Sequence, residues 1–125
     1  MADQYFISVE LDFAASHIIH GHPGKCANLH GHNWKVEVTA VATEVNDIGI
    51  GIDFCDLKGA LKQIIERLDH QHLNDVKPFD QMNPTAENLA KYIYQEMLVL
   101  LPSNVSLEHT TLWETDRSRV RYQSA

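Results

Sequence analysis

Cysteine, positive charge and long apolar runs are scarce in this sequence, and each shortage excludes a class of protein. Two cysteines, Cys26 and Cys55, are too few for the disulfide framework of a small secreted domain. Ten Lys and Arg against 17 Asp and Glu give a net charge of −7. This charge argues against a broad surface for nucleic acid or anionic membranes, although it leaves room for a local basic pocket. No stretch approaches the roughly 20 apolar residues of a membrane span.

The N-terminal residues contain no basic segment followed by a long apolar run, so no signal peptide is expected. An apolar content of 44% in 125 residues is enough for a hydrophobic core and too high for a disordered chain. We therefore expect residues 1–125 to form a single domain. A soluble protein in the reducing environment of the cytoplasm is the expected setting.

Apolar periodicity predicts four strands and two helices in the order ββααββ. The predicted elements are strands at 4–16 and 32–43, a helix from Asp53 or Asp56 to about Leu68, a helix from the N-cap Thr85 to Pro102, and strands at 105–115 and 118–123. The short span between the first two strands indicates an antiparallel hairpin. The expected fold is α+β, with a four-stranded antiparallel sheet and two helices on one face.

The stretch 26–32, Cys-Ala-Asn-Leu-His-Gly-His, holds a thiol and two closely spaced imidazoles. In an extended chain, His30 and His32 point the same way and can share one metal ion, with His17 as a third candidate ligand. Three protein ligands with a fourth position open are typical of catalytic zinc. The alternative is that these are surface histidines in a hairpin loop. His30 and His32 fall on the same alternate positions as the apolar residues of the second strand, which favours a pocket over a surface loop.

Two other polar groups allow more than one interpretation. Asp69 and His70 follow the first predicted helix, where they are either an acid–base pair or a polar helix end near the negative end of the helix dipole. The last predicted strand and the turn before it carry three arginines, each two residues from the next, which therefore point to the same face of an extended chain: Arg117, Arg119 and Arg121. They form either a solvated edge-strand face that discourages misplaced pairing or a phosphate contact.

Six segments in the same order resemble the family of 6-pyruvoyl-tetrahydropterin and 6-carboxytetrahydropterin synthases. They are 13–17 (Phe-Ala-Ala-Ser-His), 26–34 with the Cys-x-x-x-His-Gly-His-Asn-Trp pattern, 51–58, 68–74 with the Asp–His pair, 83–88 (Asn-Pro-Thr-Ala-Glu-Asn) and 114–115 (Glu-Thr). The resemblance extends along nearly the whole chain. It implies the T-fold, or tunnelling fold, and a homohexamer made of two trimers with active sites between subunits.

The resemblance also implies a role for each matching residue. These roles are Zn²⁺ binding by His17, His30 and His32, proton abstraction by Cys26, proton transfer by Asp69 and His70, and pterin recognition by Glu114. Thr85 and Glu87, at the start of the second helix, are candidates for substrate binding. Lys25, beside Cys26, is a candidate to offset the charge of a triphosphate.

The implied reaction is that of a zinc-dependent lyase acting on the small molecule 7,8-dihydroneopterin triphosphate. The three residues between Cys26 and His30 resemble the 6-carboxytetrahydropterin synthases of queuosine biosynthesis. His32-Asn33-Trp34 and Glu114-Thr-Asp116 also resemble the 6-pyruvoyl branch, which stays the alternative. Two further alternatives are a non-catalytic pterin- or zinc-binding homologue, which would not need Cys26, Asp69 or His70, and a generic metal-dependent hydrolase, which would not need Cys26.

Overall fold

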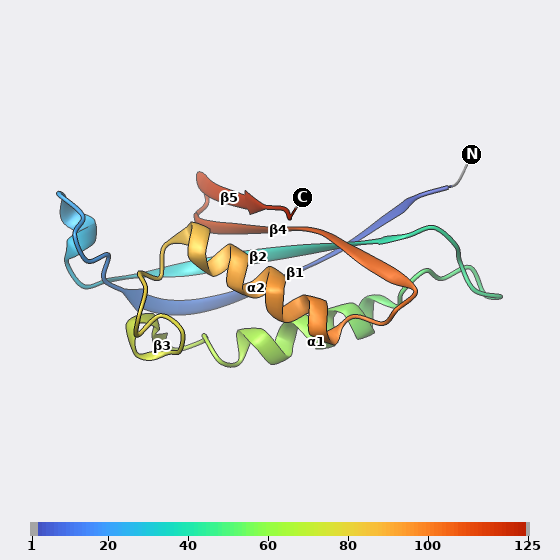
Figure 1. The fold of residues 1–125 in the computed structure, drawn as a ribbon, viewed down its shortest axis with the longest axis horizontal. Coiled ribbons are helices and arrows are strands. Elements are labelled where there is room, and N and C mark those ends of the chain that lie inside the picture. The colour runs from blue at the N-terminus through green and yellow to red at the C-terminus, as the bar shows by residue number, and fades with distance from the viewer. Residues whose placement is uncertain (1–2, 125) are drawn as a thin grey trace.

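The structure, a computed structural model, describes residues 3–124 and has one sheet with two helices against one of its faces (Figure 1). The elements are β1 (Tyr5–His17), β2 (His30–Ala42), α1 (Phe54–Ile65), β3 (Gln71–His72), α2 (Ala86–Leu100), β4 (Val105–Thr115) and β5 (Ser118–Tyr122). Two short 3-10 turns, Lys25–Ala27 and Leu73–Asp75, lie in the connections. The α+β class and the placement of both helices on one face are as the sequence predicts.

The hairpin of β1 and β2 is the longest part of the sheet, with 13 residues in each strand. The strands run antiparallel, with Tyr5 opposite Ala42 at one end and His17 opposite His30 at the other. Apolar residues alternate along both strands because only one face of the hairpin is buried against the helices. This alternation made the hairpin predictable, and both strands lie within two residues of the expected bounds.

The sheet differs from the expected one in its number of strands. It has five strands in the order β3-β1-β2-β4-β5, and β3 pairs parallel to β1 through Ala15 and Ser16. The prediction of four strands, all antiparallel, was therefore wrong in this respect. A strand of two residues has no apolar period, and its pairing arises because the chain after α1 turns back beside the end of β1.

Each helix begins at a side-chain cap. The Asp53 carboxylate accepts the Cys55 N–H at 2.7 Å, and the Thr85 hydroxyl accepts the Asn88 N–H at 3.1 Å, so each satisfies one otherwise unpaired donor. Asp53 rather than Asp56 is thus the cap of α1. This helix ends at Ile65, before the predicted Leu68, which is still fully buried in the turns that follow.

Neither described helix is long and apolar enough to cross a membrane.

The core lies between the helices and the sheet face that they cover. Trp34, Val36 and Val38 of β2 are fully buried there, together with Leu57 and Leu61 of α1. Burying a side chain of this size stabilises the fold by about 1.5–3 kcal/mol.

A truncation in α1 tests this account of the core. We expect Leu61→Ala to lower the free energy of unfolding by about 2–5 kcal/mol, because it leaves a cavity in a fully buried site. Leu98→Ala in α2 is the matched control, since that side chain is 52% exposed and its loss should change stability by no more than about 0.5 kcal/mol. Urea denaturation at one protein concentration measures both. Equal losses in the two variants would contradict this description of the core.

Candidate functional site

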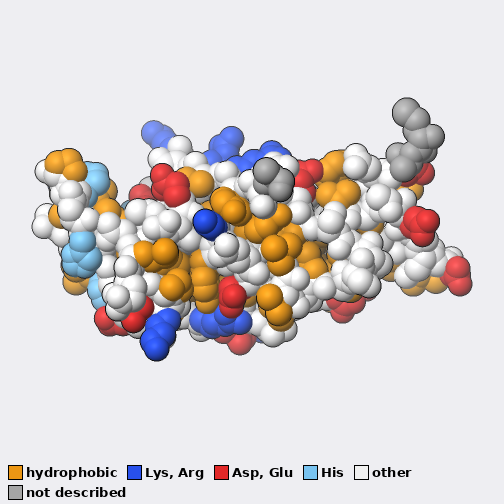
Figure 2. Space-filling model, viewed as in Figure 1, with side chains coloured by type: hydrophobic (Ala, Val, Ile, Leu, Met, Phe, Trp, Pro, Cys, Tyr) orange, Lys and Arg blue, Asp and Glu red, His pale blue; other side chains and the backbone are white. Residues whose placement is uncertain are grey.

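Three histidines converge at the end of the β1–β2 hairpin. The strand register sets His17 opposite His30 and Ala15 opposite His32, which places all three imidazoles on the face covered by the helices. Their ligand atoms all lie within 4.8 Å of one another. Histidine side chains also gather on the surface at this end of the molecule (Figure 2). The structure therefore brings together the three ligands that the sequence predicts.

Hydrogen bonds to backbone carbonyl groups orient two of the rings. His17 Nδ1–H donates to the Pro84 carbonyl at 2.8 Å, and His30 Nδ1–H donates to the Asn28 carbonyl at 2.7 Å. A carbonyl can only accept, so each Nδ1 carries a proton, and in the neutral ring Nε2 is then left with a free lone pair. Metal-binding histidines are held in this way by their second nitrogen.

The free nitrogens fit a metal ion. Among residues 3–124, Nε2 of His17 and Nε2 of His32 are buried and have no hydrogen-bond partner. A buried polar atom without a partner costs free energy, so two such atoms in one cluster need an explanation. Three imidazoles that share one point are the donor set of a catalytic zinc site with an open position. The cluster can hold a metal ion, and its chemistry suits zinc.

Burial favours the uncharged form of two of these imidazoles, those of His17 and His32. The pKa of His17 lies below its ordinary value, mainly because burial disfavours the charged ring, although the Pro84 carbonyl acts in the opposite direction. The pKa of His32 is also lowered, mainly by burial, against the attraction of Glu114. Only neutral imidazole binds a metal, so both rings are in the form that a metal ion requires at neutral pH.

Glu114, at the end of β4, faces the cluster. Its carboxylate oxygens lie 3.8 Å from His17 Nε2 and 3.7 Å from His32 Nε2. These distances are too long for hydrogen bonds, and the side chain stays 29% exposed. The carboxylate is thus free to accept hydrogen bonds from a ligand that lies beside the histidines.

Cys26 lies in the 3-10 turn Lys25–Ala27 and is half-buried. It lines a cavity of about 330 Å³ together with Thr85, Glu87 and Glu114. The structure therefore unites four of the predicted catalytic and substrate-binding residues around one space. Lys25 is exposed on the same turn and is not among the residues that line this cavity.

Asp69 and His70 form a pair at a different place. The Asp69 carboxylate accepts the Ala14 N–H and contacts His70 Nδ1, each at 2.9 Å. The bond from Ala14, more than the contact with His70, lowers the pKa of Asp69 and keeps it ionised. His70 has a positive φ of 60° and an exposed ring. The ring lines a second cavity of about 480 Å³, so within one chain His70 and Cys26 face different cavities.

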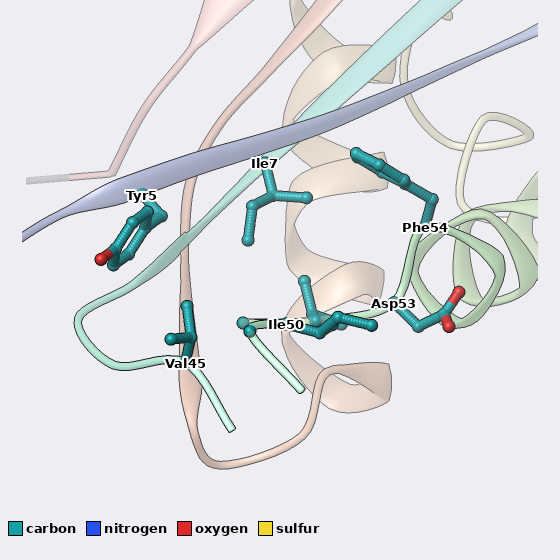
Figure 3. A pocket seen from close by; sticks show the side chains of 9 residues that line it. Tyr5, Ile7, Val45, Ile50, Asp53 and Phe54 are labelled. Carbon is teal, nitrogen blue, oxygen red and sulfur yellow. The ribbon is translucent and has the colours of Figure 1, made fainter. Parts of the chain in front are cut away.

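A third cavity, of about 270 Å³, lies at the far end of the hairpin, between β1 and the loop before α1 (Figure 3). Tyr5, Ile7, Val45 and Ile50 surround it, whereas the Asp53 carboxylate points away and caps α1. This cavity contains no histidine or cysteine. The candidate metal ligands and Cys26 lie at the other end of the hairpin.

Three further side chains at the site were not predicted. His22 lines the cavity of Cys26, and its Nδ1 accepts the Gly24 N–H at 2.9 Å. Asn74 and Asn83 hold the backbone that follows His17. Asn74 and Asn83 lie in segments that the sequence analysis identified, but their bonds to a distant backbone leave no pattern in a sequence. His22 lies between two such segments, in the turn-rich stretch before Cys26.

Comparisons with known proteins identify the family of this chain. A family model described as 6-pyruvoyl tetrahydropterin synthase matches residues 6–125. The chain is 31% identical over 140 residues to a 6-carboxy-5,6,7,8-tetrahydropterin synthase of Haemophilus influenzae, covering 94% of this chain and 97% of that protein. It is 40% identical over 105 residues to a 6-pyruvoyl tetrahydrobiopterin synthase of Poecilia reticulata, covering 80% and 70%. The solved structure of Caenorhabditis elegans 6-pyruvoyl tetrahydropterin synthase is similar, with a TM-score of 0.86 at 25% identity over 99% of this chain and 98% of that one.

The fold and the histidine cluster together define a T-fold protein with a site that can hold a metal ion. The chain belongs to the 6-pyruvoyl tetrahydropterin synthase family. The T-fold and the family that the sequence analysis expected are therefore confirmed.

Loss of one ligand tests the metal site. We expect His32→Gln to weaken Zn²⁺ binding by at least about 100-fold, because two imidazoles cannot replace three. His20→Gln is the control, since the described hydrogen bonds of His20 come from its backbone. Metal content after dialysis and competition with a chelator measure the binding. Unchanged affinity in His32→Gln would contradict the assignment.

The lowered pKa values predict a dependence of stability on pH. In the metal-free protein, unfolding lets His17 and His32 regain their ordinary pKa of 6.5, so the unfolded chain binds more protons below that pH. The free energy of unfolding should therefore fall as pH decreases from about 7.5 to about 5.5. Urea denaturation at several pH values should show a shallower fall in the double variant His17→Gln, His32→Gln. Equal slopes would count against the burial of neutral rings.

Proposed function

We propose that this protein is a zinc-dependent lyase that converts 7,8-dihydroneopterin triphosphate to 6-carboxy-5,6,7,8-tetrahydropterin, acetaldehyde and triphosphate, in the biosynthesis of queuosine. The observation that carries the proposal is the convergence of three imidazoles that can hold a metal ion, next to a cavity lined by Cys26 and Glu114. Similarity to proteins named 6-carboxy-5,6,7,8-tetrahydropterin synthase supports the substrate and the reaction. The expected cytoplasmic location stays part of this proposal.

His17, His30 and His32 would hold the zinc ion. When bound, zinc supplies a Lewis acid that polarises the hydroxyl oxygens of the substrate side chain and eases proton removal from the attached carbons. The chain prepares the site by fixing two rings through their Nδ1 atoms and by keeping His17 and His32 neutral. Ligands that are already oriented lose less conformational entropy when a metal binds.

Cys26 would act as the base, in its thiolate form, and accept a proton from a side-chain carbon. Glu114 would accept hydrogen bonds from the amino group and a ring N–H of the pterin, a two-point recognition of a planar ring. Because its carboxylate lies less than 4 Å from two of the imidazoles, a pterin held there would have its side chain close to the histidines and Cys26. Thr85 and Glu87 would complete the binding cavity, and Lys25 would offset part of the triphosphate charge.

Asp69 and His70 would transfer the remaining protons. Asp69 fixes the orientation of His70 Nδ1, which leaves Nε2 of this exposed ring available to a substrate. Since His70 and Cys26 face different cavities of one chain, the pair would serve an active site shared with a neighbouring subunit. We propose a homohexamer of two trimers. Among residues 3–124, the outer edge of β1 is paired only at Ala15 and Ser16, which leaves most of that edge open to another subunit.

The main alternative is the 6-pyruvoyl branch, because proteins named for both activities resemble the chain to a similar degree. The spacer of three residues between Cys26 and His30 favours the 6-carboxy branch. A non-catalytic pterin- or zinc-binding homologue is disfavoured by the presence of Cys26, Asp69 and His70 together.

Product analysis tests the function and separates the branches. Zinc-loaded protein given 7,8-dihydroneopterin triphosphate should yield 6-carboxytetrahydropterin and acetaldehyde, identified by mass spectrometry. We expect Cys26→Ala to lower kcat by about 10²–10⁴-fold, the usual contribution of a positioned base. Cys55→Ala is the matched control, because this second free thiol is exposed outside the cavity and its loss should leave turnover unchanged.

Each other outcome of this assay selects a different conclusion. A pyruvoyl product would keep the site and move the protein to the other branch. Release of triphosphate without change to the pterin side chain would indicate a hydrolase. Binding of zinc and pterin without any turnover would overturn the enzymatic proposal and leave a binding protein.

A further inference from the structure

Two asparagine side chains hold the backbone that leads from His17 to Cys26. The Ile18 N–H donates to Asn74 Oδ1 at 2.8 Å, and Asn74 Nδ2–H donates to the Ile18 carbonyl at 3.0 Å. Asn83 repeats this arrangement at His20, with distances of 3.0 Å from the backbone N–H and 2.8 Å to the carbonyl. Each amide thus takes the place of the peptide group that a neighbouring strand would offer.

The opposite side of the same segment is bonded to Cys26. The Ile19 N–H donates to the Cys26 carbonyl at 2.9 Å. In an extended chain, successive N–H groups point to alternate sides, so the two asparagines bind one side of residues 18–20 and Cys26 binds the other. The position of the Cys26 backbone therefore depends on a segment that the asparagines hold in place.

Hydrogen bonds and burial hold both asparagines in place. The Asn83 carbonyl accepts Asn88 Nδ2–H at 2.8 Å, which ties it to the first turn of α2. The next carbonyl, that of Pro84, accepts His17 Nδ1–H. Asn74 lies in the 3-10 turn Leu73–Asp75, whose Leu73 is fully buried. Asn83 is thus tied to α2, and Asn74 lies in a turn that is anchored in the core.

We propose that Asn74 and Asn83 are positioning residues that form an amide clamp on residues 18–20 and set where His17 and Cys26 lie relative to each other. Ile18 transmits the constraint to His17, its neighbour in the chain, and Ile19 transmits it to Cys26. The inference rests on the proposed roles of His17 and Cys26, although the clamp can be measured without the reaction.

The clamp requires an amide in particular. Asparagine offers one acceptor and one donor and so satisfies both groups of a peptide, whereas an ionised carboxylate only accepts. Asn83→Asp keeps the size of the side chain, loses the bond to the His20 carbonyl and sets a negative charge against that oxygen. Asn74→Asp does the same at Ile18. Asn104→Asp is the matched control, because Asn104 Nδ2–H donates to the Gly51 carbonyl at 2.9 Å, away from the histidines.

Two measurements test the clamp independently of turnover. The first is the alkylation rate of Cys26 by iodoacetamide relative to Cys55 in the same molecule, followed by peptide mass spectrometry. The second is Zn²⁺ affinity by competition with a chelator. We expect Asn83→Asp and Asn74→Asp each to change the ratio of alkylation rates several-fold and to weaken Zn²⁺ binding about 10–100-fold, as for other residues that orient ligands. Asn104→Asp should leave both unchanged.

A purely structural role would give another result. If the clamp variants lose stability in urea to the same extent as Asn104→Asp, with unchanged Zn²⁺ affinity and alkylation ratio, the inference is wrong. If an Asp variant does not fold, Asn83→Ser and Asn74→Ser remove the paired bonds without adding charge and are judged by the same two measurements. A wild-type protein that binds zinc but does not convert the pterin would refute the proposed function alone.

Discussion

The candidate metal site depends on the register between β1 and β2. A slip of one residue would turn every side chain of one strand to the opposite face and would separate His17 from His30 and His32. The register is fixed by the core, where Phe13 and Trp34 stand opposite each other with ring centroids 5.9 Å apart. The apolar residues that hold the hairpin in place therefore also determine where the three imidazoles meet.

The parts of the fold that could be predicted are those with a repeated burial pattern. The hairpin and both helices bury one face over many residues, so their apolar periods are visible in the sequence. The end of α1 was placed too late because Leu68 continues the apolar stripe after the helical hydrogen bonds have ended. Strand β3 was missed because its two residues are placed by their neighbours and not by their own pattern.

The candidate site was predictable to the extent that its residues share one strand face or one recognisable segment. His30 and His32 are two residues apart in an extended chain, so their convergence follows from local geometry. The separation of His70 from Cys26 could not be read in this way, because it depends on how the chain after α1 returns to β1. Asn74 and Asn83 act through distant backbone groups, which no periodicity records.

His70 has a backbone conformation that favours glycine, with a φ of 60°. A residue with a β-carbon costs roughly 1–2 kcal/mol in this region, and the bonds that Asp69 and His70 make to Ala14 hold it there. His70→Gly would relieve this strain and remove the imidazole. A search for more stable variants that ignored activity would thus select glycine at the position where the proposed chemistry needs a histidine, so evolution for stability and evolution for catalysis would diverge at this residue.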